Sequence, residues 1–269
     1  MNERTVVTRA NPPVRLLDSV YVTEQTFDGM TVRGLVISGS RRSLIFDTLV
    51  FPEKIKELLS ACSGREIIVV YSHADWDHVW GTCGLQPVEV IAHEECARRF
   101  KDPGDVEKTF NEYRAKFEND LASIRLVPPR RTFKDSMSLD LGGITVELRH
   151  CPGHTSDSIL AVVPERGLLL GADCIETPLP LLNEGPENLL RWISVLADLE
   201  ADPRIMTCVP SHGTIGGREL LSDNISYLKS LLLPESVPRR GLDAFYSAGH
   251  SENRSKAAAL RADENIRGG

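Results

Sequence analysis

A short run of metal-binding side chains, placed directly after an apolar segment, constrains this chain more than any other feature. The run is His73-Ala74-Asp75-Trp76-Asp77-His78, and the apolar segment before it is Ile67–Tyr71. An apolar segment of this length predicts a buried strand, so the run should form the loop at the strand's C-terminal end. In extended backbone the side chains alternate, which places His73, Asp75 and Asp77 on one face. Where the chain turns after Asp77, neighbouring side chains diverge, so this loop can supply ligands to two metal ions.

Three further candidate ligands follow in the chain, each just after an apolar run. They are His154, Asp173 and His212. Glycine or proline stands close to each of them, and these residues permit tight turns and a close approach of the backbone to an ion. A single histidine after a strand is more often a structural residue than a ligand. Four such positions, each at a predicted strand end, favour a metal site.

Apolar patterning predicts two similar halves made of strands and helices. In the first half we expect strands at 16–23, 31–38, 43–48, 67–71 and 88–91. We expect three helices there, one that begins at Pro52, one at 94–100 and one at 105–124. In the second half we expect strands at 131–134, 145–149, 158–163, 167–171 and 205–209, and helices at 189–199 and 218–233. This order favours an α/β fold with two sheets and helices outside them.

The predicted helix at 105–124 is polar but carries an apolar stripe at helical spacing. The stripe consists of Phe110, Tyr113, Phe117 and Leu121, and it predicts a face packed on the body of the protein. A cap over the mouth of an active site and a contact in a homo-oligomer are the alternatives.

Several residues close to the candidate ligands have a structural interpretation. Trp76 and Trp80 flank the metal-binding loop and are expected to stiffen it by packing, rather than to stack on a substrate. His93 and His150 do not fit the ligand pattern and are interpreted as structural. Glu176 follows Asp173 closely enough to reach the mouth of a site there.

The order and spacing of these motifs resemble the metallo-β-lactamase superfamily. The matching features are the loop at 73–78, the turn Pro152-Gly153-His154-Thr155, the later Asp173 and the final His212-Gly213. Asp47, at the end of the strand before Pro52, resembles an early aspartate of the family that supports the metal ligands. The resemblance covers about residues 16–230 and implies a four-layer αββα sandwich. We therefore predict a metallo-β-lactamase-like domain at 1–233, with a helical insert at about 94–124, and a polar C-terminal tail at 234–269.

The resemblance also implies a ligand set for two divalent metal ions. One ion would be held by His73, Asp75 and His154. The other would be held by Asp77, His78 and His212, with Asp173 bridging the two ions. Asp77 would in addition act in catalysis, by orienting the nucleophile and carrying its proton.

Asp75 departs from the family pattern, which has a second histidine at this position. Two divalent ions, three carboxylates and one hydroxide sum to zero charge, whereas a histidine here would leave one positive charge. The extra carboxylate is a harder donor, so it should weaken the ions as Lewis acids and move the preference from zinc toward iron or manganese. A carboxylate at this position also resembles the flavodiiron branch of the superfamily, which has glutamate there.

Composition narrows the choice of partners and compartment. The net charge of −7 argues against a nucleic-acid backbone as partner, so a small molecule is expected. No apolar stretch is long enough to span a membrane, and the first nine residues lack the apolar core of a secretion signal. The six cysteines show no Cys-x-x-Cys spacing, so reduced thiols in a cytoplasmic protein are expected.

The function that the resemblance implies is a dinuclear metallohydrolase. A metal-bridging hydroxide would attack an ester, thioester or lactone. The first alternative is a diiron protein that binds or reduces oxygen or nitric oxide, which Asp75 suggests. The second is a metal-binding protein without catalytic activity. Many chemistries share this fold, so the fold alone does not choose between them.

Overall fold

The structure is a computed structural model that describes residues 12–85, 87–234 and 241–267. The chain divides into two compact units, residues 1–148 and 149–269. It contains two β-sheets together with helices, which confirms the predicted α/β class. The predicted domain limits at 233 and 234 stay a prediction.

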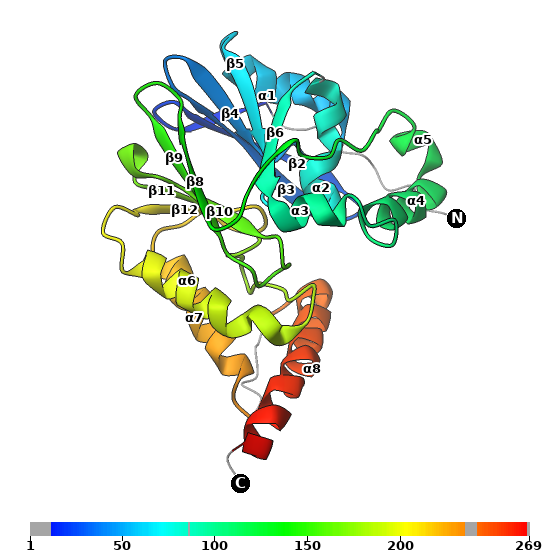
Figure 1. The fold of residues 1–269 in the computed structure, drawn as a ribbon, viewed down its shortest axis with the longest axis vertical. Helices are drawn as coiled ribbons and strands as arrows, with labels where there is room; N and C mark the ends of the chain where they lie inside the picture. Colours follow the sequence, from blue (N-terminus) through cyan, green and yellow to red (C-terminus); the bar gives the residue numbers. More distant parts are fainter. Residues whose placement is uncertain (1–11, 86, 235–240, 268–269) are drawn as a thin grey trace. The chain divides into compact units, whose positions relative to one another are not determined.

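Unit 1 is built around a seven-stranded sheet whose strands lie in chain order (Figure 1). The strands are β1 (Val14–Leu17), β2 (Val20–Phe27), β3 (Met30–Ser38), β4 (Arg42–Phe46), β5 (Glu66–Val70), β6 (Glu89–His93) and β7 (Arg131–Phe133). Neighbours from β1 to β4 are antiparallel, and those from β4 to β7 are parallel. Val69 of β5 pairs with Ile45 on one side and with Val90 on the other. The apolar run before the metal-binding loop is thus a central strand, as its composition predicts.

The helices of unit 1 follow the ends of these strands. They are α1 (Ile55–Ala61), α2 (Trp76–Val79), α3 (Glu94–Arg99), α4 (Val106–Lys116) and α5 (Glu118–Leu121), with 3₁₀ turns η1 (Pro52–Lys54) and η2 (Trp80–Leu85). Pro52 stands in the first turn of η1, where its missing N–H has no cost. Ile55 and Leu58 of α1 are buried in the core. The unit ends with β8 (Ser136–Asp140) and most of β9 (Thr145–His150).

Two of the predicted elements in unit 1 are wrong in extent. The strand expected at 16–23 is two strands, because Ser19 adopts a left-handed backbone (φ 63°) and the chain turns between β1 and β2. The helix expected at 105–124 is interrupted at Phe117, whose φ of −129° and ψ of 43° are not helical. Strand β8 was not predicted.

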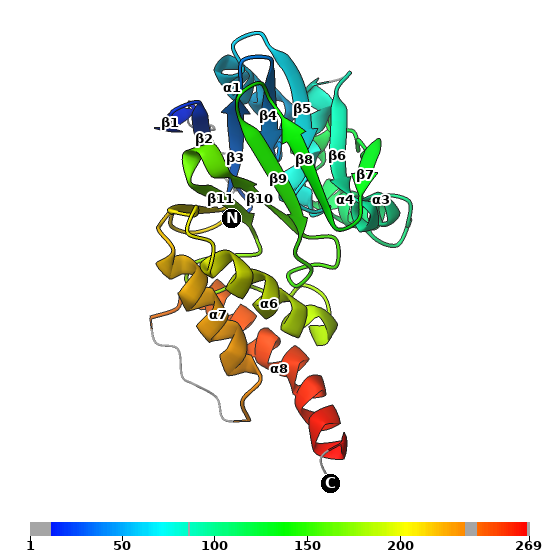
Figure 2. The ribbon, with the colours of Figure 1, turned by 60° about the vertical axis from the view of Figure 1, so that its left-hand side comes forward.

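Unit 2 contains strands β10 (Ile159–Val163), β11 (Leu168–Ala172) and β12 (Thr207–Pro210) of the second sheet, whose five strands are β8 to β12. β10 and β11 are antiparallel, and β11 and β12 are parallel. Helices α6 (Leu189–Glu200) and α7 (Glu219–Leu231) pack on each other (Figure 2). The 3₁₀ turns are η3 (Pro164–Arg166) and η4 (Pro186–Asn188). α6 buries an apolar face at helical spacing, which includes Leu189, Trp192 and Leu196.

The C-terminal part of the chain, expected to be a polar tail, contains a long helix. This helix, α8, spans Ala244–Arg267 and contacts α7 and η4. Its buried Asn253 accepts a hydrogen bond from the backbone N–H of Leu182 (2.8 Å) and donates to the carbonyl of Pro180 (2.8 Å) and to the hydroxyl of Tyr227 (2.9 Å). The sequence does not predict that α8 packs on the protein, because its anchoring residue, Asn253, is polar and does not belong to an apolar stripe.

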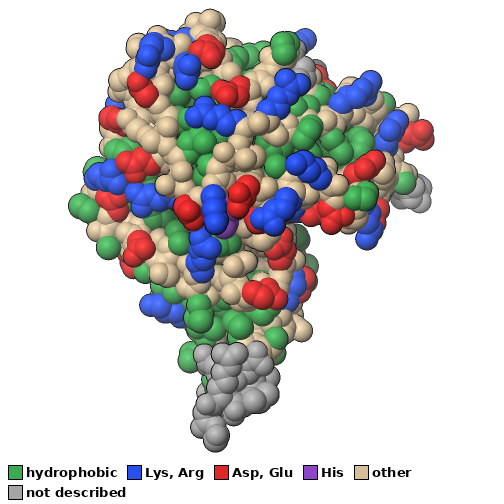
Figure 3. Space-filling model, in the orientation of Figure 1, with side chains coloured by type: hydrophobic (Ala, Val, Ile, Leu, Met, Phe, Trp, Pro, Cys, Tyr) green, Lys and Arg blue, Asp and Glu red, His purple; other side chains and the backbone are tan. Residues whose placement is uncertain are grey.

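No helix in the described ranges is long and apolar enough to cross a membrane. On the face drawn in Figure 3, basic and acidic side chains are interspersed.

Replacing Asn253 by alanine should destabilise the protein by about 2–3 kcal/mol, because three buried groups lose their hydrogen-bond partner. Thermal or urea unfolding measures the change. Ser255→Ala, at an exposed position of the same helix, is the matched control and should stay within about 0.5 kcal/mol of wild type. Equal stabilities of the two variants would show that α8 is not anchored through Asn253.

Candidate metal centre

The predicted metal-binding loop of unit 1 lies between strand β5 and helix α2. Asp75 is the N-cap of α2, with φ −66° and ψ 150°, but its carboxylate does not cap the helix. Asp77 and His78 lie in the first turn of α2. The helix therefore begins directly after Asp75, earlier than expected, and the prediction that Asp77 shares one face of extended backbone with His73 and Asp75 is wrong. His73, Asp77 and His78 are each at most 3% exposed.

Behind these side chains lies a fully buried carboxylate, that of Asp47 at the end of β4. Its Oδ1 accepts the backbone N–H of Ser72 (2.7 Å), and its Oδ2 accepts the Ser72 hydroxyl (2.7 Å) and Nδ1–H of His78 (2.8 Å). Because a carboxylate can only accept here, His78 carries its proton on Nδ1 and presents Nε2 as the ligand atom. The Ser72 hydroxyl also lies 2.9 Å from Nδ1 of His73. One carboxylate thus orients both ends of the loop, as the early aspartate of the sequence pattern suggested.

The ligand atoms of unit 1 lie in pairs. His73 Nε2 is 3.6 Å from Asp75 Oδ2, and His78 Nε2 is 3.5 Å from Asp77 Oδ2. The other oxygen of Asp75, Oδ1, accepts a hydrogen bond of 2.8 Å from Nη2 of Arg99. The sequence analysis did not identify Arg99.

In unit 2, the Pro-Gly-His-Thr turn positions His154. A Cβ atom at Gly153 would lie 2.1 Å from the ring of Trp192, so only glycine fits at this point of the turn. Nδ1 of His154 donates to the carbonyl of Leu181 (2.8 Å), which leaves Nε2 as its acceptor and ligand atom. Asn183 Nδ2 lies 3.1 Å from that Nε2.

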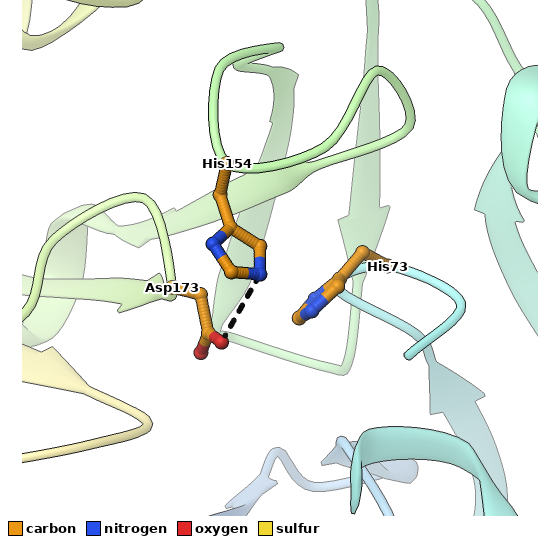
Figure 4. Close-up of side chains that lie close together, drawn as sticks. All are labelled: His73, His154 and Asp173. Atoms are coloured by element: carbon orange, nitrogen blue, oxygen red, sulfur yellow. Dashed lines mark ion pairs between the residues drawn. The ribbon is translucent and has the colours of Figure 1, made fainter. Parts of the chain in front are cut away.

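Asp173 places one carboxylate oxygen against two histidines. Its Oδ2 is 3.5 Å from Nε2 of His154 (Figure 4). The same oxygen is 3.4 Å from Nε2 of His212. Gly213, next to His212, has a left-handed backbone (φ 86°) that a side chain would strain. An oxygen shared by two histidines is the arrangement expected of a bridging carboxylate.

These four histidine–carboxylate distances fit metal ligands. They span 3.4–3.6 Å, which is longer than the usual hydrogen bond between such groups. Two ligands at the usual distances from one tetrahedral zinc ion lie about 3.4 Å apart. Each pair combines an imidazole nitrogen with a carboxylate oxygen, and both donor types bind zinc, iron and manganese. The residues of each unit therefore suit a divalent ion.

Glu176 is a further buried acid of unit 2, three residues after Asp173. It is 3% exposed, and its Oε1 accepts a hydrogen bond of 2.6 Å from the hydroxyl of Tyr246 on α8. Burial raises the pKa of Glu176 to about 7, and the nearby Asp173 acts in the same direction, while His212 and the Tyr246 hydrogen bond oppose it. Its backbone is held by Asn224, which pairs with both N–H and C=O of Glu176. Near neutral pH this carboxyl can therefore hold or release a proton.

Helix α8 also supports the loop that orients His154. Asn253 binds the backbone on both sides of Leu181, and Lys256 donates to the carbonyls of Leu182 (2.5 Å) and Asn183 (3.1 Å). The carbonyl of Leu181 is the group that fixes the tautomer of His154. Sequence reasoning missed these residues, because no metal-ligand chemistry marks them.

The aromatic residues beside the loop pack on one another, as the sequence analysis favoured. The rings of Trp76 and Tyr113 are 4.8 Å apart, and the ring of Phe110 meets that of Trp80 edge to face at 5.3 Å. The stripe of α4 thus covers the two tryptophans within unit 1. The structural interpretation of His93 also fits, since its Nδ1 accepts the N–H of Glu95 as the cap of α3.

The predicted structural role of His150 and the predicted free thiols agree with the structure. His150 Nε2 donates to the carbonyl of Ser156 (2.8 Å). All six cysteines are free.

Comparison with known proteins points to one family. The sequence model of the metallo-beta-lactamase superfamily matches residues 30–263. Among solved structures, a metallo-beta-lactamase from Pontibacter korlensis is 22% identical, with a TM-score of 0.61 over 81% of this chain and 98% of that chain. The metallo-beta-lactamase FIM-1 from Pseudomonas aeruginosa, in its mono-zinc form, is 18% identical, with a TM-score of 0.63 over 82% of this chain and 97% of that chain. At these identities the structural matches establish the fold.

A curated relative is similar over a shorter stretch. The linear primary-alkylsulfatase of Pseudomonas sp. (strain ATCC 19151) is 28% identical over an alignment of 103 residues, which covers 36% of this chain. The match spans 19% of the length of that relative.

Replacing Glu176 by glutamine should change how stability depends on pH in the metal-free protein. The folded-state pKa of about 7 lies above the ordinary carboxyl value of 4.5, so wild type loses stability as the pH rises from 4.5 to 7. The variant lacks this loss and should gain on wild type by up to about 3 kcal/mol at pH 8. Unfolding with chelator present, at pH 5 and pH 8, measures the difference. Glu187→Gln, at an exposed position, should show no such gain, and a constant difference for Glu176→Gln would contradict the prediction.

Proposed function

Because the chain belongs to the metallo-β-lactamase superfamily, we propose that it is a dinuclear metal-dependent hydrolase of ester-, thioester- or lactone-type substrates. The observation that carries this proposal is the shared oxygen of Asp173, at 3.4 and 3.5 Å from two histidines. A carboxylate in that position suits a bridge between two ions. The superfamily supports hydrolase activity in general, and the substrate class is our proposal.

We assign the ligands by the order of the family motifs. His73, Asp75 and His154 would hold one ion, and Asp77, His78 and His212 the other, with Asp173 as the bridge. The distances within unit 1 support the assignment of these ligands to two different ions, because the carboxylate of Asp75 lies beside His73 while that of Asp77 lies beside His78. Zinc is the first expectation, and iron or manganese are the alternatives.

When bound, two divalent ions would lower the pKa of a coordinated water and polarise the substrate oxygen. The residues of the chain supply orientation and proton transfer. Asp47 holds His78 in the tautomer that presents Nε2, and the carbonyl of Leu181 does the same for His154. Asp77 would orient the attacking group and take its proton. Glu176 is buried in unit 2 and held by the hydroxyl of Tyr246 and by Asn224.

A diiron oxidoreductase is the second candidate, and the carboxylate of Asp75 is the observation that favours it. A mixed set of histidine and carboxylate ligands is typical of non-haem iron sites. Metal analysis together with an optical spectrum separates the two functions. A colourless zinc protein supports the hydrolase, and an oxo-bridged diiron absorption supports the oxidoreductase.

The purified protein should carry about two metal ions per chain. Asp173→Ala should remove more metal than Asp75→Ala, because a bridge serves both ions and Asp75 serves one. Its melting temperature should fall as well, since metal binding stabilises the folded state. Elemental analysis and thermal unfolding measure both effects, with Asp120→Ala, at an exposed position, as the control. Loss of both ions in Asp75→Ala and of none in Asp173→Ala would refute the assignment of the bridge.

The metal-loaded protein should hydrolyse an activated ester, thioester or lactone. A panel of one compound from each class tests this, and an alkyl sulfate is added because of the local similarity to an alkylsulfatase. We expect Asp77→Asn to lower kcat by at least about a hundredfold, as is usual for loss of a group that transfers protons. A fully loaded protein that hydrolyses none of the four classes would favour the oxidoreductase or a non-catalytic role.

A further inference from the structure

A partly buried arginine contacts the candidate ligand that departs from the family pattern. Nη2 of Arg99 donates to Oδ1 of Asp75 at 2.8 Å, and the two side chains are 16% and 18% exposed. Asp75 occupies the N-cap position of α2, but its carboxylate makes no hydrogen bond to the backbone N–H groups of the helix. Its Oδ1 accepts from Arg99 instead. Ion pairs with little access to water are stronger than those at the surface.

A second carboxylate fixes the arginine in place. Asp105, the N-cap residue of α4, accepts from Nε (2.9 Å) and from Nη2 (3.1 Å) of Arg99. This two-point contact is the fork geometry that orients a guanidinium. Arg99 ends α3, so the contact joins the ends of α3 and α4 to the metal-binding loop of unit 1. Asp105 is more exposed than Asp75, at 31% against 18%.

The contact leaves Asp75 one oxygen for other partners. Oδ1 is taken by Arg99, and Oδ2 lies 3.6 Å from Nε2 of His73, at the spacing of two ligands on one ion. A carboxylate held in this way offers one oxygen and less negative charge than a free one. In both respects it comes closer to the neutral, single-donor histidine that the family has at this position.

We propose that Arg99 is a positioning residue that makes Asp75 act as a one-oxygen ligand and so moves the metal preference of the site toward zinc. Without Arg99, Oδ1 of Asp75 would lose this hydrogen bond, and the negative charge of the carboxylate would no longer be offset by the guanidinium. Ions that prefer more oxygen ligands, such as manganese(II), then gain relative to zinc. Because it takes Asp75 as a metal ligand, this role of Arg99 rests on the proposed function.

The test is the ratio of the dissociation constants for zinc and manganese(II), measured by competition with chelators. Effects common to both ions cancel in this ratio. Arg99→Gln should move the ratio toward manganese by about tenfold, and Arg99→Lys, which keeps the charge, by less than about threefold. The neighbouring Arg98→Gln is the matched control, since Arg98 pairs with Glu94 and Glu95 instead, and it should leave the ratio unchanged.

A double-mutant cycle shows whether Arg99 acts through Asp75. In an Asp75→His background, Arg99→Gln should no longer move the ratio. A shift of equal size in both backgrounds, or none in the wild-type background, would overturn the role of Arg99 while two bound ions in wild type still supported the proposed function. If wild type binds no metal, the proposed function and the role of Arg99 both fail.

A second variant covers the case in which Arg99→Gln does not fold, as judged by circular dichroism of the metal-free protein. Asp105→Asn leaves Arg99 and Asp75 in place but weakens the fork that orients the guanidinium. It should move the ratio in the same direction by a smaller amount. An unchanged ratio in a folded Asp105→Asn variant would count against the proposal.

Discussion

The buried carboxylate of Asp47 is the interaction on which unit 1 and its metal-binding loop depend. A fully buried charge is costly unless it is hydrogen-bonded, and Asp47 accepts three hydrogen bonds, from Ser72 N–H, Ser72 Oγ–H and His78 Nδ1–H. These bonds join the end of β4 to the end of β5 and to α2. The backbone N–H of Thr48 adds a bond to the carbonyl of His78 (2.8 Å). The same contacts that stabilise the fold thus orient two of the candidate ligands.

In unit 2 a backbone carbonyl, rather than a carboxylate, orients a candidate histidine ligand. There the orientation of His154 depends on a backbone carbonyl, that of Leu181, and the loop that carries it is held by side chains of α8. Backbone carbonyls and carboxylates are both common partners of metal-binding histidines, because either one fixes the tautomer. The C-terminal helix is therefore part of the support of the site, and the Tyr246 hydroxyl of the same helix donates a hydrogen bond to the buried Glu176.

The departure at position 75 has a counterpart in the structure. A carboxylate in place of histidine adds negative charge, and from the sequence we expected a harder, more iron-like site. Arg99 lies against that carboxylate and offsets part of its charge. In our proposal, the carboxylate at position 75 and the arginine beside it would act in opposite directions on metal preference.

Local chemistry determined what the sequence could predict. The strand before His73, the helix after Pro52 and the candidate ligands follow from patterns within a few residues, because side-chain alternation and donor type are local properties. The predicted extents of the strand at 16–23 and of the helix at 105–124 were wrong, because Ser19 and Phe117 interrupt apolar patterns that look continuous in the sequence. Only the tertiary structure decided which distant groups support the ligands. Arg99 is 24 residues from Asp75, Tyr246 is 70 from Glu176, and Asn253 is 71 from Leu182. Such contacts depend on which helices and loops lie next to each other in the folded protein. The local patterns of the sequence contain no information on this.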